Sequence, residues 1–185
     1  MNDHFPTPAT AADVLAFWRD AGPQRWFRKD KAFDRDFRER FLAAHEAAAQ
    51  GRFDAWANDA QGALALLILL DQFPRNAFRG SLRSFVTDAK ARDIARAAVA
   101  AGFDRQVDEA LRNFFYLPFM HSEKLSDQQF GETLAAGLGD DALKWARLHA
   151  DIIRRFGRFP HRNAVLGRDS TPEEQAFLDA GGFAG

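Results

Sequence analysis

The balance between alanine and the β-branched residues constrains the fold of this chain more than any other feature of its sequence. Of the 185 residues, 34 are Ala, whereas Val, Ile and Thr together supply 14. Ala is the strongest helix former, and strands are enriched in β-branched residues and depleted in Ala. The composition therefore predicts an all-α protein, with 19 Phe and 4 Trp to fill its core.

Apolar side chains recur three and four residues apart along most of the chain, as in Phe33, Phe37 and Phe41. This spacing is typical of helices with one buried face. Together with capping residues and breakers it predicts about eight helices with short connections, over residues 10–22, 30–51, 58–73, 87–102, 104–117, 126–137, 140–157 and 171–181.

Some helix ends and faces carry more specific expectations. Pro74 is expected to end the third helix, because proline cannot donate a backbone hydrogen bond. Thr87 is expected to cap the fourth helix, and Ser126 with Gln129 to form a capping box at the sixth. In the helix over 140–157, Trp145, Leu148, Ile152 and Phe156 form the predicted inward stripe, and His149 is expected to be a hydrogen-bonded core residue.

Length and composition bound the class of protein. A chain of this length is predicted to be a single domain over residues 1–185. A net charge of −1 gives no field to attract nucleic acid or an anionic membrane. The absence of Cys excludes a disulfide framework and a thiol nucleophile. The longest apolar run, Ala63–Leu70, is too short to cross a bilayer, which takes about 20 residues. The first residues show no secretory signal, so a cytoplasmic protein is expected.

Two segments of the chain have similar sequences. Residues 73–80 read Phe-Pro-Arg-Asn-Ala-Phe-Arg-Gly, and residues 159–168 read Phe-Pro-His-Arg-Asn-Ala-Val-Leu-Gly-Arg. Each follows the end of an apolar helix, where proline stops the helix and arginine favours the negative end of its dipole. The candidate ligand-binding residues in these loops are Arg75, Asn76, Arg79, Arg158, Arg162 and Asn163.

The density of arginine leaves two interpretations open. The second loop also has Arg154, Arg155 and Arg168 nearby, and like charges at this density repel unless acids or a bound anion neutralise them. The loops are therefore either an internal network of ion pairs and caps, in which Asp71 would need an arginine partner, or the lining of an anion-binding pocket. The same bidentate chemistry serves both.

A third segment, Pro118–Glu123, contains His121 and Glu123. With His161 of the second loop, these residues could supply acid–base groups or a site with two His and one carboxylate. The default interpretation is that they are structural, hydrogen-bonded polar groups. Their spacing matches no zinc signature, so neither a metal nor a cofactor is expected.

Five segments together carry a family resemblance: Trp26–Phe27, Leu70–Arg79, Pro118–Glu123, Arg155–Asn163 and Leu166–Glu174. They spread over nearly the whole chain, and their combination resembles a bacterial family known as domain-of-unknown-function family 924. The resemblance implies a tetratricopeptide-like α-α superhelix and a soluble bacterial protein. It supplies neither a reaction nor a ligand, and because the tetratricopeptide consensus is missing, peptide binding is not carried over from the fold.

Three functions remain open at this point. The preferred hypothesis is a binding module whose partner is an anionic small molecule or peptide, held by the two Arg-Asn loops. The alternative is a hydrolase or lyase acting on an anionic substrate through His121 or His161 with Glu123. A third possibility is a scaffold whose exposed helix faces bind another protein.

Overall fold

A computed structural model describes residues 9–184, and all regular structure in that range is helical. The predicted all-α class is confirmed. The residues form two compact units: Met1–Arg79 with Arg83–Phe115 (unit 1), and Gly80–Leu82 with Tyr116–Gly185 (unit 2). The single domain and the tetratricopeptide-like superhelix both concern how the units are arranged, and they stay predictions. The first eight residues, on which the prediction about a secretory signal rests, lie outside the described range.

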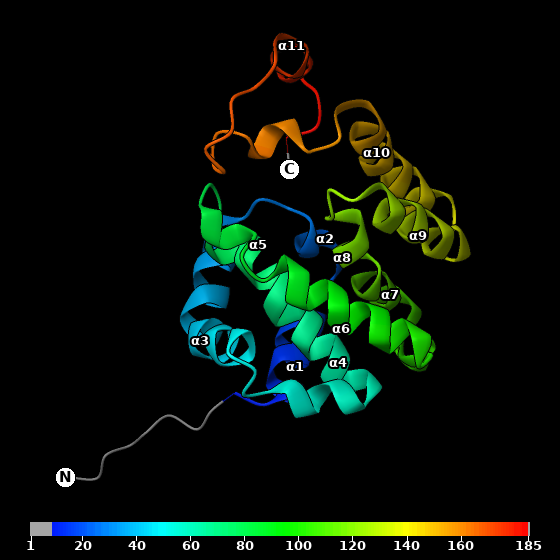
Figure 1. Ribbon diagram of the computed structural model, residues 1–185. Helices are drawn as coiled ribbons and strands as arrows, with labels where there is room; N and C mark the ends of the chain where they lie inside the picture. The colour runs from blue at the N-terminus through cyan, green and yellow to red at the C-terminus, as the bar shows by residue number, and fades with distance from the viewer. Residues whose placement is uncertain (1–8, 185) are drawn as a thin grey trace, which may run out of the picture. The chain divides into compact units, whose positions relative to one another are not determined.

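Unit 1 is built around a buried helix (Figure 1). Its α-helices are α1 (Ala11–Ala21), α2 (Pro23–Trp26), α3 (Lys31–Ala49), α4 (Ala60–Leu67), α5 (Phe73–Ala77), α6 (Asp88–Ala100) and α7 (Glu109–Arg112). Helices α1 and α6 both pack against α4, and α3 packs against α5. Every residue from Ala63 to Leu70 is fully buried, as expected for a helix that is apolar on all sides.

The prediction that this central helix ends before Pro74 was wrong. After α4 the chain continues as a π-helical turn, Ile68–Gln72, and then directly as α5. The N–H of Phe73 bonds to the carbonyl of Ile68, five residues back. The wider turn makes room for the proline ring, which would collide with a carbonyl in an uninterrupted α-helix. Pro74 is therefore accommodated at the start of α5.

Side chains bind the carbonyls of residues 69–71 in this π-helical turn. Their partners, in that order, are His45 Nδ1 at 2.8 Å, Thr87 Oγ1 at 2.6 Å and Arg75 at 2.8 Å. Thr87 takes the predicted N-cap position of α6, but its hydroxyl makes no cap hydrogen bond because it bonds to the carbonyl of Leu70 instead. His45 is buried and stacks on Phe73. Because a buried carbonyl left without a donor costs about 1–3 kcal/mol, these partners stabilise the π-helical turn.

Unit 2 contains α8 (Leu117–Met120), α9 (Leu125–Ala135), α10 (Asp140–Phe156) and α11 (Pro172–Asp179). Helix α9 packs against α8 and α10 (Figure 1). Ile152 and Ile153, near the C-terminal end of α10, form a small core with Phe159, and partly buried phenylalanines pack against it. No helix within residues 9–184 is both long and apolar enough to cross a membrane.

Three further details of the predicted helices were wrong. The expected helix over 104–117 is interrupted where Val107 takes an extended conformation, with φ −113° and ψ 166°. Helix α9 begins at Leu125 without a side-chain cap, in place of the capping box expected at Ser126. On α10, Trp145 is 57% exposed and Leu148 40% exposed, so these two residues do not belong to the inward face.

Candidate functional site

The first Arg-Asn loop is held by carboxylates of its own unit. Arg75 donates to both oxygens of Asp88, at 2.9 and 3.1 Å, and lies 3.2 Å from Asp71, which is 1% exposed. Burial acts to lower the pKa of Arg75, but the charges of Asp71 and Asp88 outweigh it and raise that pKa. Arg75 is therefore the arginine partner that the sequence predicted for Asp71.

The other two candidate residues of this loop share one acid. Arg79 donates to the two oxygens of Asp34 on α3 at 2.7 and 3.1 Å, and Asn76 donates to the same carboxylate at 2.8 Å. The Asp34 side chain is 15% exposed. The guanidinium groups of the first loop are therefore already bound to carboxylates in unit 1.

The second loop repeats this pattern within unit 2. Arg158 donates to both oxygens of Glu174 on α11, at 2.6 and 2.7 Å, and Asn163 donates to the same acid at 3.2 Å. The Thr171 N–H completes a capping box on this carboxylate. The bond from Arg158 is the main reason that the pKa of Glu174 falls to about 2. Glu174 is therefore a buried anion at neutral pH.

Glu123 ties the Pro118–Glu123 segment to the second loop. Its two oxygens accept from Arg168 at 2.7 and 2.9 Å, and one of them also accepts from the Phe159 N–H at 2.8 Å. Burial acts to raise the pKa of Glu123, but the bonds from Arg168 and Phe159 outweigh it and lower the pKa. The segment is fastened a second time by Arg162, which is 6% exposed and donates to the carbonyl of His121 at 2.9 Å.

Three histidines gather in unit 2. The ring centroids of His121 and His149 lie 6.3 Å apart, and the rings of His149 and His161 both contact Phe159 and Phe183. His149 is buried and bonds to the carbonyl of Trp145, in keeping with the core role expected of it. Burial, followed by the charge of Arg162, lowers the pKa of His161 to about 4, so its imidazole is neutral at pH 7.

The structure thus brings part of the predicted site together. His121, Glu123, Arg158, His161, Arg162 and Asn163 lie in unit 2, whereas Arg75, Asn76 and Arg79 lie in unit 1. The convergence of the two loops on one ligand stays a prediction. In the part of the chain that the structure describes, no three His or acidic residues are placed to hold a metal ion.

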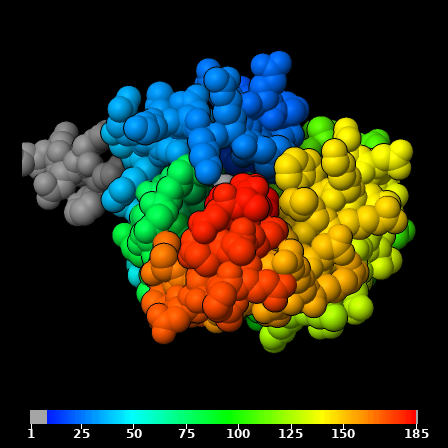
Figure 2. Space-filling view, turned by 90° about the horizontal axis from the view of Figure 1, so that it is seen from above, coloured from blue at the N-terminus to red at the C-terminus, as the bar shows by residue number. Residues whose placement is uncertain are grey.

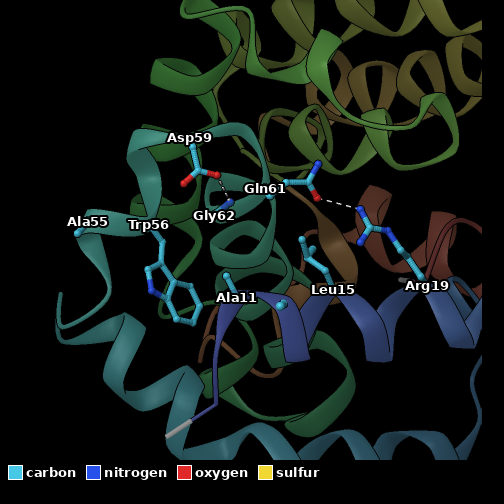
Figure 3. A pocket seen from close by; sticks show the side chains of 9 residues that line it. Ala11, Leu15, Arg19, Ala55, Trp56, Asp59, Gln61 and Gly62 are labelled. Atoms are coloured by element: carbon cyan, nitrogen blue, oxygen red, sulfur yellow. Dashed lines mark hydrogen bonds between the residues drawn. The ribbon is translucent and has the colours of Figure 1, made fainter.

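A cleft that the sequence motifs did not indicate lies in unit 1 (Figure 3). Its volume is about 430 Å³, and α1, α4 and the 3-10 segment Asp54–Asn58 line it. Trp56 stands at one end with Asp59 above it, Arg19 and Gln61 lie at the other end, and Leu15 is between them. One end of the cleft therefore has an aromatic ring and an acid, and the other end has a cation.

Close backbone contact builds this cleft. A Cβ on Gly62 would lie 2.1 Å from the carbonyl oxygen of Trp56, so only glycine lets the 3-10 segment approach α4. Asp59 fixes the same junction by accepting from the Gly62 N–H at 2.9 Å. A glycine in an otherwise apolar helix is the sequence signal that could have pointed here.

Arg19 differs from the arginines of the two loops in its partners. It donates to the neutral side-chain oxygen of Gln61 at 2.8 Å. Its nearest acid in the described chain is Asp108, which is 3.8 Å away and 74% exposed. A water-exposed pair at that distance contributes little, so the Arg19 guanidinium keeps hydrogen-bonding capacity toward the cleft.

The comparisons with known proteins show the family and no activity. No curated protein matches the chain. The "Structure of Protein of Unknown Function ATU0120 from Agrobacterium tumefaciens" is 50% identical, with a TM-score of 0.90, over 92% of this chain and 97% of that one. Residues 14–182 match the family described as "Bacterial protein of unknown function (DUF924)". The chain therefore belongs to this bacterial family, as the five segments of the sequence indicated.

Proposed function

We propose that this protein is a binding module for a small molecule that combines an anionic group with a flat apolar part, and that the ligand occupies the Trp56–Arg19 cleft of unit 1. One observation carries the proposal: a ligand-sized cleft holds an arginine whose close partner is a neutral amide. Carboxylate and phosphate are the groups that a guanidinium fork binds best.

The two ends of the cleft set the order of the ligand's parts. The anion would lie against Arg19, because Asp59 at the Trp56 end repels negative charge. A ring would lie against Trp56, since aromatic faces attract one another and bury much area. A volume of about 430 Å³ is ample for such a molecule, given that ligand clefts span roughly 300–1,000 Å³.

The two Arg-Asn loops have a different role in this proposal. Arg75, Arg79, Arg158 and Arg168 each face a carboxylate at hydrogen-bond distance, so an incoming anion would have to displace an intramolecular acid. We therefore assign the loops to the internal ion-pair network and not to the ligand. A cytoplasmic setting and the absence of nucleic-acid and membrane partners belong to the same proposal.

The hydrolase or lyase alternative is less favoured. It needs Glu123 to assist His121 or His161, but both oxygens of Glu123 already accept hydrogen bonds. A carboxylate held in this way orients the segment around it and does not take up a proton near neutral pH.

Binding can be tested with phenylacetate, phenyl phosphate and the neutral phenylacetamide, by titration calorimetry and NMR. We expect phenylacetate or phenyl phosphate to bind and phenylacetamide to bind at least about tenfold more weakly, since a charge-assisted hydrogen bond contributes about 1.5–3 kcal/mol. Arg19→Gln should abolish this preference, whereas Arg105→Gln, an exposed arginine elsewhere in unit 1, should keep it.

Two results would contradict the proposal. One is that neither anion binds the wild type at millimolar concentration. The other is binding that Arg19→Gln leaves unchanged while Arg75→Ala weakens it, which would return the site to the first Arg-Asn loop.

A further inference from the structure

Helix α10 carries a stripe of five residues with the spacing of a helix–helix contact, and four of them are exposed. Asp141, Trp145, Leu148, Ile152 and Arg155 follow one another at intervals of four, three, four and three residues. This is the interval pattern of a seam between two paired helices. Trp145 and Leu148 in its middle are 57% and 40% exposed, whereas Ile152 is buried.

The opposite face of α10 already has its contacts. Ala146, His149, Ala150 and Ile153 are buried, and the helix packs on α9. Figure 2 shows atoms of the first half of α10, in yellow, at the surface of unit 2. The exposed tryptophan is therefore not needed for packing within unit 2, and burying an aromatic side chain of this size is a strong drive toward association.

We propose that this stripe is a self-association surface, on which α10 of one copy pairs antiparallel with α10 of a second copy, centred on Leu148. Charge selects this orientation. The acid Asp141 lies seven residues before Leu148 and the base Arg155 lies seven residues after it. Antiparallel pairing places each Asp141 opposite the Arg155 of the other copy, whereas parallel pairing places like charges together.

The charged residues beside the stripe also favour the antiparallel orientation. Lys144 and Asp151 lie four residues before and three residues after Leu148, so antiparallel pairing also brings these opposite charges together across the contact. Asp141 and Arg155 of one copy are separated by 14 residues, or about 21 Å of helix. They cannot pair with each other within one chain. Each lies at the end of α10 where the helix dipole favours its charge, and antiparallel pairing gives the two charges a second role, between two chains.

The present partners of these charges leave them available. Arg155 bonds to Glu173 at 2.9 Å, but both side chains are more than half exposed. Asp151 bonds to Arg154 at 2.8 Å and is 72% exposed. Exposed pairs of this kind contribute little and exchange readily. Because one helix pair makes a contact at the small end of the range for protein interfaces, below about 1,200 Å², the dimer is expected to be reversible.

Sedimentation equilibrium from about 1 to 500 µM tests the proposal. The mass should rise with concentration from 20.8 kDa toward twice that value. Trp145→Ser and Leu148→Ser should each weaken dimerisation at least about tenfold, as for residues at the centre of an interface. Circular dichroism checks that both variants fold. A wild type that stays at 20.8 kDa throughout, or association that neither variant weakens, overturns the proposal.

Charge reversal tests the orientation. Asp141→Lys and Arg155→Glu should each weaken dimerisation, and an equimolar mixture of the two variants should restore it, because each heterodimer then has two opposite-charge contacts. Glu173→Gln is the control, since it removes the existing partner of Arg155 and should leave dimerisation intact or strengthen it. The single variants separate the two orientations, because in a parallel pair each reversal only replaces one like-charge contact with another. Single variants that dimerise as well as the wild type, or a mixture no stronger than the separate variants, overturn the antiparallel arrangement.

Discussion

Replacing Glu174 with Gln tests whether the second loop is an internal ion-pair network. The carboxylate is 2% exposed and accepts from Arg158 at 2.6 and 2.7 Å and from the Thr171 N–H at 2.8 Å. Gln keeps the size of the side chain but removes its charge. The variant therefore loses the charge-assisted part of these bonds without opening a cavity.

The magnitude follows from the pKa of Glu174, which falls from 4.5 to about 2. At about 1.4 kcal/mol per pKa unit, this corresponds to roughly 3 kcal/mol, or about 2–3 kcal/mol once screening at the partly exposed Arg158 is allowed for. A carboxyl group whose pKa is lower in the folded state stabilises the fold fully at pH values above its pKa in the unfolded state, here 4.5. That stabilisation is lost as the pH falls through about 2.

Hydrogen exchange of the α11 amides, with urea unfolding at each pH, measures the difference between wild type and Glu174→Gln. We expect the free energy of unfolding of the variant to be about 2–3 kcal/mol lower than that of the wild type at pH 7. This difference should shrink toward zero between about pH 4.5 and 2. The neighbouring Glu173→Gln is the matched control, because Glu173 is 64% exposed and should change stability by at most about 1 kcal/mol. A difference that does not depend on pH, or a control that costs as much, refutes the reasoning.

Three further perturbations address other parts of the fold. Thr87→Val should cost about 1–3 kcal/mol in urea unfolding, because the carbonyl of Leu70 loses its donor, and unchanged stability would contradict its role at the π-helical turn. Gly62→Ala should destabilise unit 1 by about 3 kcal/mol or more, since its Cβ would meet the Trp56 carbonyl at 2.1 Å; a wild-type melting temperature would refute this. His161, with a pKa lowered to about 4, binds protons less well in the folded state, so acid destabilises the protein between pH 6.5 and 4. His161→Phe should flatten stability against pH in that window, and an unaltered slope would contradict the assignment.

The sequence was sufficient for the class of fold but not for the helix that crosses Pro74. Helical periodicity and alanine content depend on local preference, and both predicted an all-α chain correctly. The π-helical turn is stabilised by side chains far away in sequence, because His45 and Thr87 bind the carbonyls of Leu69 and Leu70. Sequence spacing shows no such partners, so the local rule that proline ends a helix took precedence.

The same limit applies to the candidate sites. The stripe through Trp145 and Leu148 has the spacing of a buried face, yet the structure exposes both residues. Periodicity identifies residues that share a side of a helix, but not what that side contacts. Glu123 and Arg168 are 45 residues apart, and their bidentate pair could not be inferred from spacing either.

The charge of the partner group distinguishes two roles of arginine that look alike in the sequence. In both Arg-Asn loops the guanidinium fork closes on carboxylates of the same unit, so removing the arginine leaves an acid without its counterion, and the cost appears as lost stability. Arg19 donates to an amide and lines a cleft, and the one acid near it in the described chain, Asp108, is 74% exposed, so removing Arg19 leaves no buried acid without a counterion. The proposed role of Arg19 therefore requires that its loss reduces affinity for an anion while stability is kept. The proposed role of Arg75 requires that its loss reduces stability while affinity for the anion is kept.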